Sequence, residues 1–109
     1  MGLRFLKNRT ASKIESVGKE IQSLIDVEIK NSNFEIENNS PFNQAGMLDG
    51  LHVVNEYNSV GEYGLAFEHV LYMIHETGLK LNKQSSDIIN DLAREMNISI
   101  DHIENQLIK

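Results

Sequence analysis

Four histidines are the side chains of this sequence best suited to proton transfer near neutral pH: His52, His69, His75 and His102. His52 lies four residues before Glu56, so on a helix the two side chains would share one face and could contact the same metal ion. Two ligands do not make a metal site, and the sequence contains neither a cysteine nor the HExxH pattern. We therefore predict no metal ligands and no cofactor.

The spacing patterns of common catalytic sites are also missing. Small helical ribonucleases of the HEPN type place an Arg four to six residues before a His, and no Arg here has that spacing. The sequence has no Gly-rich phosphate loop after a strand and no GxSxG motif. We predict no catalytic residues and no enzyme. The alternative is a small hydrolase that uses His and Glu. Loss of a turnover activity after a single His-to-Ala change would support it.

The distribution of charge is the most informative feature. Between Asn31 and Glu76 the chain has no Lys or Arg but seven acids: Glu35, Glu37, Asp49, Glu56, Glu62, Glu68 and Glu76. A segment with charges of one sign repels itself, so we interpret it as a surface that attracts a basic partner. The alternative is a solvated acidic face that keeps the protein soluble. A net charge of −6 argues against nucleic acid as the ligand.

Length and composition predict one globular domain over residues 1–109. The chain has 40% apolar and 24% charged residues, as globular proteins do. Without cysteine it forms no disulfide. The first nine residues lack the apolar core of a secretory signal, and no apolar run approaches the roughly 18 residues of a membrane helix. We expect a cytoplasmic protein without membrane contact.

The first predicted helix carries an apolar stripe with spacings of three and four residues: Ile14, Val17, Ile21, Leu24 and Ile25. It begins either near Leu3 or at Ser12, where a capping-box pattern starts. Residues 30–40 are rich in Asn. They predict a loop that holds a brief extended piece with Phe34 and Ile36 alternating.

The second predicted helix starts with Ser40 as its cap and Pro41 at its first position, and runs to about Tyr57. Its inward residues come from the set Phe42, Leu48, Leu51 and Val54. Gly46 and Gly50 lie inside this helix, where glycine weakens helical structure. They indicate a weak helix, a later helix start, or close approach of another helix.

The third predicted helix begins with a capping box in which Glu62 reaches back to Ser59, after a turn at Asn58-Ser59. Gly78 ends it. The inward stripe is Tyr63, Ala66, Phe67, Val70 and Ile74. The outward side carries Glu68, Tyr72, His75 and Glu76. Tyr72 would be either an apolar anchor within an acidic rim or a half-buried residue beneath the 30–40 loop.

The fourth predicted helix is capped by Asn82 or Ser85 and stops at Asn97. Its inward residues are Ile88, Ile89, Leu92 and Met96. Ser99 caps a last short helix with Ile100, Ile103 and Leu107 at helical spacing. Together these patterns predict an all-α fold, a single-domain bundle of four to five helices.

One segment carries a family resemblance. Residues 60–68 read Val-Gly-Glu-Tyr-Gly-Leu-Ala-Phe-Glu, followed after an acidic helix by Gly78-Leu79 and then by Ile88, Leu92, Ala93 and Met96. Over residues 55–98 the chain resembles small bacterial immunity proteins of the MafI type, which belong to polymorphic toxin and contact-dependent growth inhibition systems. The matching motif positions are Gly61, Glu62, Tyr63, Gly64, Ala66 and Glu68. Residues 1–45 match only in their helical, apolar pattern.

The resemblance implies an all-helical cytoplasmic protein that binds one cognate toxin domain, commonly a nuclease, and blocks it without being an enzyme. Within the motif we expect Gly64 to let a neighbouring helix approach, Glu62 to cap, and Glu68 to contact the partner. A nuclease holds nucleic acid in a basic cleft, which an acidic surface can cover. The predicted protein-binding residues are Asp49, His52, Glu56, Glu62, Glu68, Tyr72, His75 and Glu76.

A second hypothesis comes from a different class of protein. The chain would be a non-enzymatic helical adaptor or regulator that dimerises and binds a non-toxin protein through an apolar surface. It would then form a stable dimer, and its binding would be insensitive to ionic strength. An immunity protein is instead expected to be a monomer or a weak homodimer.

Overall fold

The computed structural model describes residues 2–33 and 35–108, with side chains from Arg9 onward. These residues form four α-helices and two 3₁₀ segments and no strand, which confirms the predicted all-α bundle. In chain order the elements are α1 (Gly2–Asn31), η1 (Pro41–Asn43), α2 (Gly50–Ser59), α3 (Tyr63–Thr77), α4 (Lys83–Met96) and η2 (Asp101–Gln106). None of the described helices has the length and apolar character needed to cross a membrane.

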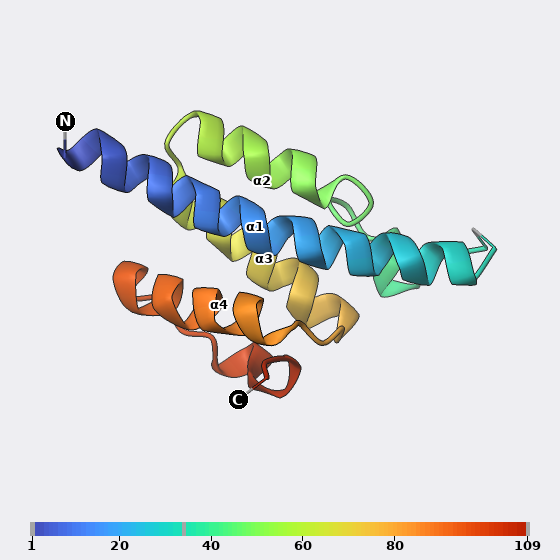
Figure 1. The fold of residues 1–109 in the computed structure, drawn as a ribbon. Coiled ribbons are helices and arrows are strands. Elements are labelled where there is room, and N and C mark those ends of the chain that lie inside the picture. Colours follow the sequence, from blue (N-terminus) through green and yellow to red (C-terminus); the bar gives the residue numbers. More distant parts are fainter. Residues whose placement is uncertain (1, 34, 109) are drawn as a thin grey trace.

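The long helix α1 packs against all three other α-helices. Figure 1 shows α1 running diagonally across the molecule, with α2 on one side, α4 on the other and α3 behind it. α2 and α3 form an antiparallel hairpin, and η2 packs against α3. The hairpin is tied to the N-terminal half of α1 where Asn58 Nδ2 donates a hydrogen bond to the carbonyl of Ala11 at 3.2 Å.

α1 is longer than its apolar stripe predicted. Of the predicted stripe, Ile14, Val17, Ile21 and Ile25 are fully buried and Leu24 is half-buried. Ile29 extends the stripe by one turn, which keeps the chain helical to Asn31. Ser12 lies inside the helix, so a start at Ser12 is wrong. Between α1 and η1, residues 32–33 and 38–39 form turns and residues 35–37 have no regular structure, so no strand forms among them. Phe34 of the predicted extended piece lies outside the described residues.

The second predicted helix is wrong in its extent, although its first residues behave as expected. The Ser40 hydroxyl accepts a hydrogen bond from the Phe42 amide at 3.1 Å, and Pro41 begins a helical turn. That turn is the 3₁₀ segment η1, which ends after three residues. Gly46 has φ of 77°, a left-handed conformation that interrupts a right-handed helix. Its carbonyl lies 2.9 Å from His69 Nε2 on α3, which holds the turn in place.

α2 starts at Gly50 because a side chain of α1 caps it. Gln22 Oε1 accepts a hydrogen bond from the Leu51 amide at 2.9 Å, and Gln22 Nε2 donates to the Leu48 carbonyl at 3.2 Å. Gly50 is buried, and a Cβ atom placed there would lie 2.3 Å from Cε of Met73 on α3. Two of the proposed explanations for the glycine pair therefore apply: the helix starts later, and α3 approaches closely at Gly50.

The turn between α2 and α3 differs from the predicted capping box. Ser59 is the last residue of α2, and its hydroxyl donates to the Glu56 carbonyl at 2.7 Å. Glu62 stands at the N-cap position of α3 but forms no side-chain capping bond. Gly61, with φ of 80°, makes the turn. A Cβ atom at Gly64 would meet nothing within 4 Å, so the helix approach expected there is also wrong.

The core faces of α3 and α4 follow the predicted periodicity. Ala66, Phe67, Val70 and Ile74 are fully buried, as are Ile89 and Leu92, while Tyr63, Ile88 and Met96 are half-buried. The periodicity missed Met73 and Leu71, which are also buried. Gly78 ends α3 with φ of 67°, and its N–H donates to the Ile74 carbonyl at 2.9 Å, as predicted.

The ends of α4 and the last segment are also close to prediction. The Asn82 side chain accepts a hydrogen bond from the Ser85 amide at 2.8 Å and caps α4. Asn97 ends the helix with φ of 53°. The last predicted helix is the 3₁₀ segment η2, which begins at Asp101, and its Ile103 is fully buried.

Candidate functional site

The predicted binding residues of α2 lie on its outer side. Asp49, His52 and Glu56 are all exposed, and the last two are one helical turn apart. His52 Nε2 lies 2.9 Å from Glu56 Oε1, with about 70% of both side chains exposed to solvent. Because Gln22 caps α2, the Asp49 carboxylate makes no capping bond and stays free to face solvent.

On α3, Glu68, Tyr72 and Glu76 follow one another at one-turn intervals along the same side of the helix. Glu68 is exposed, whereas Tyr72 and Glu76 are half-buried. The Tyr72 hydroxyl donates to Gln44 Oε1 at 2.8 Å, and the Tyr72 ring lies 5.5 Å from the ring of His69. Tyr72 therefore packs beside the turn at residues 44–46 and supports that turn from α3.

His75 follows Tyr72 by one turn on the outward side of α3 and also contacts the C-terminal segment. Its Nδ1 atom lies 3.1 Å from the His102 carbonyl, and the two imidazole rings are 5.2 Å apart. Met73, two residues earlier, contacts α2 at Gly50, and positions two apart on a helix point to different sides. His75 thus lies on the edge of α3 that faces η2. Glu62 is exposed in the turn that joins α2 to α3.

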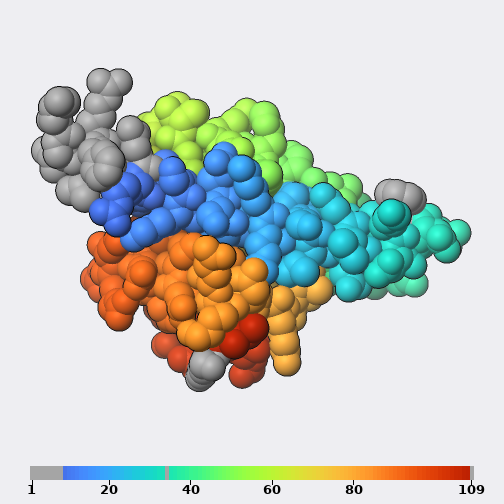
Figure 2. All heavy atoms as spheres, in the orientation of Figure 1, coloured from blue at the N-terminus to red at the C-terminus, as the bar shows by residue number. Residues whose placement is uncertain are grey.

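Charge is unevenly distributed over the surface. In the described part of the chain, every ion pair of a Lys or Arg joins α1 to α4 or lies within one of these helices: Lys13–Glu95, Lys19–Glu15, Lys83–Asp87 and Arg94–Asp91. Figure 2 shows the face of the molecule formed largely by α1 and α4. α2 and α3 contain no Lys or Arg. Among the described residues, the carboxylates of Asp49, Glu62, Glu68 and Glu76 have no side-chain partner.

Apolar side chains are exposed among these acids. Val60 in the turn is 71% exposed, and Leu65 on α3 is 45% exposed. Val53 and Tyr57, both half-buried on α2, line a shallow hollow of about 480 Å³ together with Glu56, Ser59 and Val60. Protein interfaces commonly combine an apolar centre with a polar rim. The hairpin of α2 and α3 offers both.

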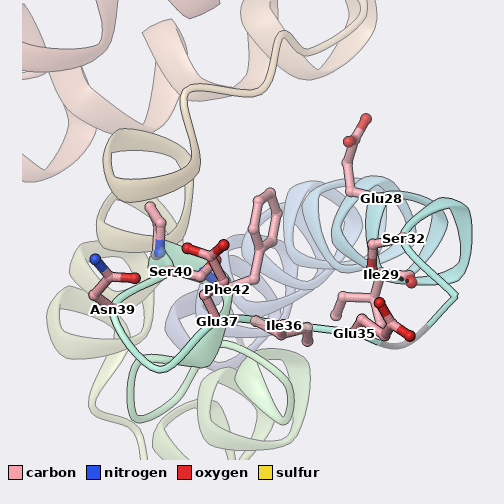
Figure 3. A pocket seen from close by; sticks show the side chains of 10 residues that line it. Glu28, Ile29, Ser32, Glu35, Ile36, Glu37, Asn39, Ser40 and Phe42 are labelled. Carbon is pink, nitrogen blue, oxygen red and sulfur yellow. Dashed lines mark hydrogen bonds between the residues drawn. The ribbon is translucent and has the colours of Figure 1, made fainter.

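A second acidic feature lies at the C-terminal end of α1. Figure 3 shows a hollow between this end of the helix and the segment at residues 35–42. Its volume is about 500 Å³, and its lining residues are Glu28, Ile29, Ser32, Glu35, Ile36, Glu37, Asn39, Ser40, Pro41 and Phe42. Sequence reasoning did not include these residues in the site. The available signals were the positions of Glu35 and Glu37 in the stretch from Asn31 to Glu76 that has no Lys or Arg, and the apolar Phe42 five residues after Glu37.

A metal site is not apparent among the described residues, which contain no cluster of three or more potential His, Asp or Glu ligands. Comparison with protein-family models, curated proteins and solved structures finds no match to this chain. The resemblance to MafI-type immunity proteins therefore stays a prediction from the motif at residues 60–68.

Proposed function

We propose that this chain is an immunity protein that binds the basic toxin domain of a polymorphic toxin system and blocks it. The toxin domain is a nuclease in this proposal, and the binding surface is the hairpin of α2 and α3. The protein is not an enzyme and acts in the cytoplasm, where an incoming toxin would reach nucleic acid.

The separation of charges in space is the observation that carries the proposal. In the described structure four basic side chains of α1 and α4 form ion pairs with neighbouring acids, whereas no acid of α2 or α3 is paired with a Lys or Arg. Carboxylates without a Lys or Arg partner on one hairpin repel one another, so they are more stable facing water or a basic partner than packed against the rest of the protein. A partner with a basic cleft would relieve this repulsion and gain close charge pairs.

The exposed apolar residues of the hairpin support an interface over a purely solubilising surface. Val60 and Leu65 leave apolar area in water, which a surface kept only for solubility would avoid. In a complex they would form the dry centre, and Glu56, Glu62 and Glu68 would surround it. Charge complementarity would also raise the association rate, which suits a protein that must capture a toxin quickly.

The test is a titration of the chain with the C-terminal domain of the secreted protein encoded beside its gene. We expect tight binding, loss of the domain's nuclease activity, and weaker binding at higher salt. The double change Glu68→Lys and Glu76→Lys should weaken binding about 100-fold or more, because close interfacial charge pairs contribute about 1.5 kcal/mol or more each.

A matched control keeps the net charge equal. Asp87→Lys and Asp91→Lys change the charge by the same amount on α4, on the other side of α1 from α2. This control should bind the toxin domain nearly as well as the unmodified chain does. Equal loss of affinity in the two variants, or no loss in either, would contradict binding through the hairpin.

A further inference from the structure

The hollow at the C-terminal end of α1 is built from two segments that the fold brings together. Glu28, Ile29 and Ser32 come from the last turns of α1, and the remaining lining residues come from the segment that leads into and includes part of η1. Ser40 fixes this segment by capping η1, which places Phe42 toward the hollow. In Figure 3 the Phe42 ring stands between Glu37 on the loop and the end of α1.

The rim of the hollow is negatively charged. Glu28, Glu35 and Glu37 are exposed, and in the described structure none of them forms an ion pair. Lys30 is close in sequence but lies elsewhere on the α1 surface, where it lines another hollow together with Lys19 and Leu51. The basic residue nearest in sequence therefore does not line the acidic hollow.

The floor of the hollow is apolar. Ile29 is 8% exposed and belongs to the core, and Ile36 and Phe42 are partly buried against the same core. An apolar floor bordered by exposed acidic residues matches a side chain with an apolar stem and a cationic head. A metal ion would gain no binding energy from the apolar floor, and the acidic residues around the hollow would repel an anionic ligand.

We propose that this hollow receives an arginine side chain from the basic partner of the hairpin, as a second contact that selects the cognate partner. The proposal rests on the proposed function, because that function supplies a basic protein partner. Arginine fits better than lysine, since its planar guanidinium stacks on an aromatic face such as Phe42 and donates in a fork to carboxylates. Lysine would gain the charge attraction but not the stacking.

The first experiment needs no toxin. The ¹⁵N-labelled chain is titrated at low ionic strength with N-acetyl-arginine methylamide, and N-acetyl-lysine methylamide serves as the comparison. We expect saturable amide shifts confined to residues 28–42, at least threefold tighter for the arginine compound. Shifts spread evenly over α2 and α3, or equal affinity for the two compounds, would refute an arginine pocket.

Two variants with equal charge changes separate the hollow from general acidity. Glu35→Gln with Glu37→Gln should abolish the saturable shifts, whereas Glu68→Gln with Glu76→Gln should leave them unchanged. None of these four side chains forms an ion pair in the described structure, so the variants should keep the fold, which the dispersion of the spectrum checks. Retained shifts in the first variant would overturn the proposal.

A second experiment uses the toxin domain and distinguishes the two proposals. If the hollow is a contact, Glu35→Gln with Glu37→Gln should weaken binding about tenfold or more, since it removes two charges from the cation's surroundings. An unchanged affinity in this variant, together with a loss in the hairpin variant, would refute the hollow as a contact and leave the proposed function standing. If the unmodified chain does not bind the toxin domain, the proposed function fails, and so does the role of the hollow in partner selection.

Discussion

Gly50 gives the sharpest test of the packing between α2 and α3. A Cβ atom at this position would lie 2.3 Å from Cε and 2.5 Å from Sδ of Met73, and 3.3 Å from Oε1 of Gln22. Met73 is fully buried, so its thioether must find another place inside the core. Such overpacking costs about 1–3 kcal/mol, and because Gly50 is the first residue of α2, the better helix propensity of alanine offsets less than the roughly 0.5–1 kcal/mol of a helix interior. Gly50→Ala should therefore destabilise the fold by about 1–2 kcal/mol.

Gly64 provides a matched control on the neighbouring helix. A Cβ atom there would meet nothing within 4 Å, and its backbone is not among the glycines with positive φ. Gly64→Ala should therefore stabilise the fold by about 0.5 kcal/mol, because alanine loses less backbone entropy on folding. The same chemical change is thus expected to have opposite effects at two positions 14 residues apart.

Thermal and urea unfolding, followed by circular dichroism at the helix band, measure both variants. For domains of roughly this size, 1 kcal/mol shifts Tm by about 4–8 °C. We expect Tm to fall by about 5–10 °C for Gly50→Ala and to rise by about 2–4 °C for Gly64→Ala, with unchanged dependence on urea. A Gly50→Ala variant as stable as the unmodified chain would show that the close approach of α3 to α2 does not constrain this position.

Two further predictions concern single residues that join or end helices. Gln22→Met keeps the side-chain volume but leaves the Leu51 amide and the Leu48 carbonyl without their side-chain partner. Urea unfolding should therefore show that the free energy of unfolding falls by about 1–3 kcal/mol. A fall of less than about 0.5 kcal/mol would mean that water replaces these hydrogen bonds. Gly78→Ala places a Cβ atom on a residue with φ of 67°, so the free energy of unfolding should fall by about 1 kcal/mol in the same measurement. Gly78→Asn should lower it less, because Asn adopts the left-handed conformation more readily. Equal losses of stability in the two variants would argue against backbone strain as the cause.

The features that the sequence predicted well depend on local chemistry. Gly78, Asn82 and Asn97 each mark a helix end through their own backbone preference or their own side chain, so neighbouring residues suffice to identify them. The core stripes of α1, α3 and α4 follow the 3.6-residue period because each of these helices buries one continuous side. Such patterns do not depend on which helix lies opposite.

The errors arose where distant residues decide the structure. Residues 44–49 were predicted as helix, but their turn is held by His69, and the start of α2 is fixed by Gln22, far away in the sequence. Ser59 matched a capping box, yet the hairpin turn at Gly61 leaves its hydroxyl bonded to its own helix. A serine can stand either at the N-cap of one helix or at the last position of the helix before it, so a local sequence pattern cannot distinguish the two positions.

The candidate site was predictable in part for the same reason. Helical spacing alone places Glu68, Tyr72 and Glu76 on one side of α3. It could not show that His75 would face η2, because that depends on where the C-terminal segment packs. The acidic hollow was not predictable either, since Glu28 lies on α1 and Glu37 on a loop, and only the fold brings them to one rim.

In the proposed complex, the length of α1 sets the footprint of the partner. The hairpin is tied to α1 at Ala11, and the hollow is built on Ile29, so these anchor points are separated by about 27 Å at about 1.5 Å per residue. An ordinary interface covers about 800 Å² on each protein, which corresponds to a disc about 30 Å wide. A single small domain could therefore cover the whole span, and a shorter ligand could contact both places only near Gln22, where α2 begins about 10 Å from Ile29 along α1.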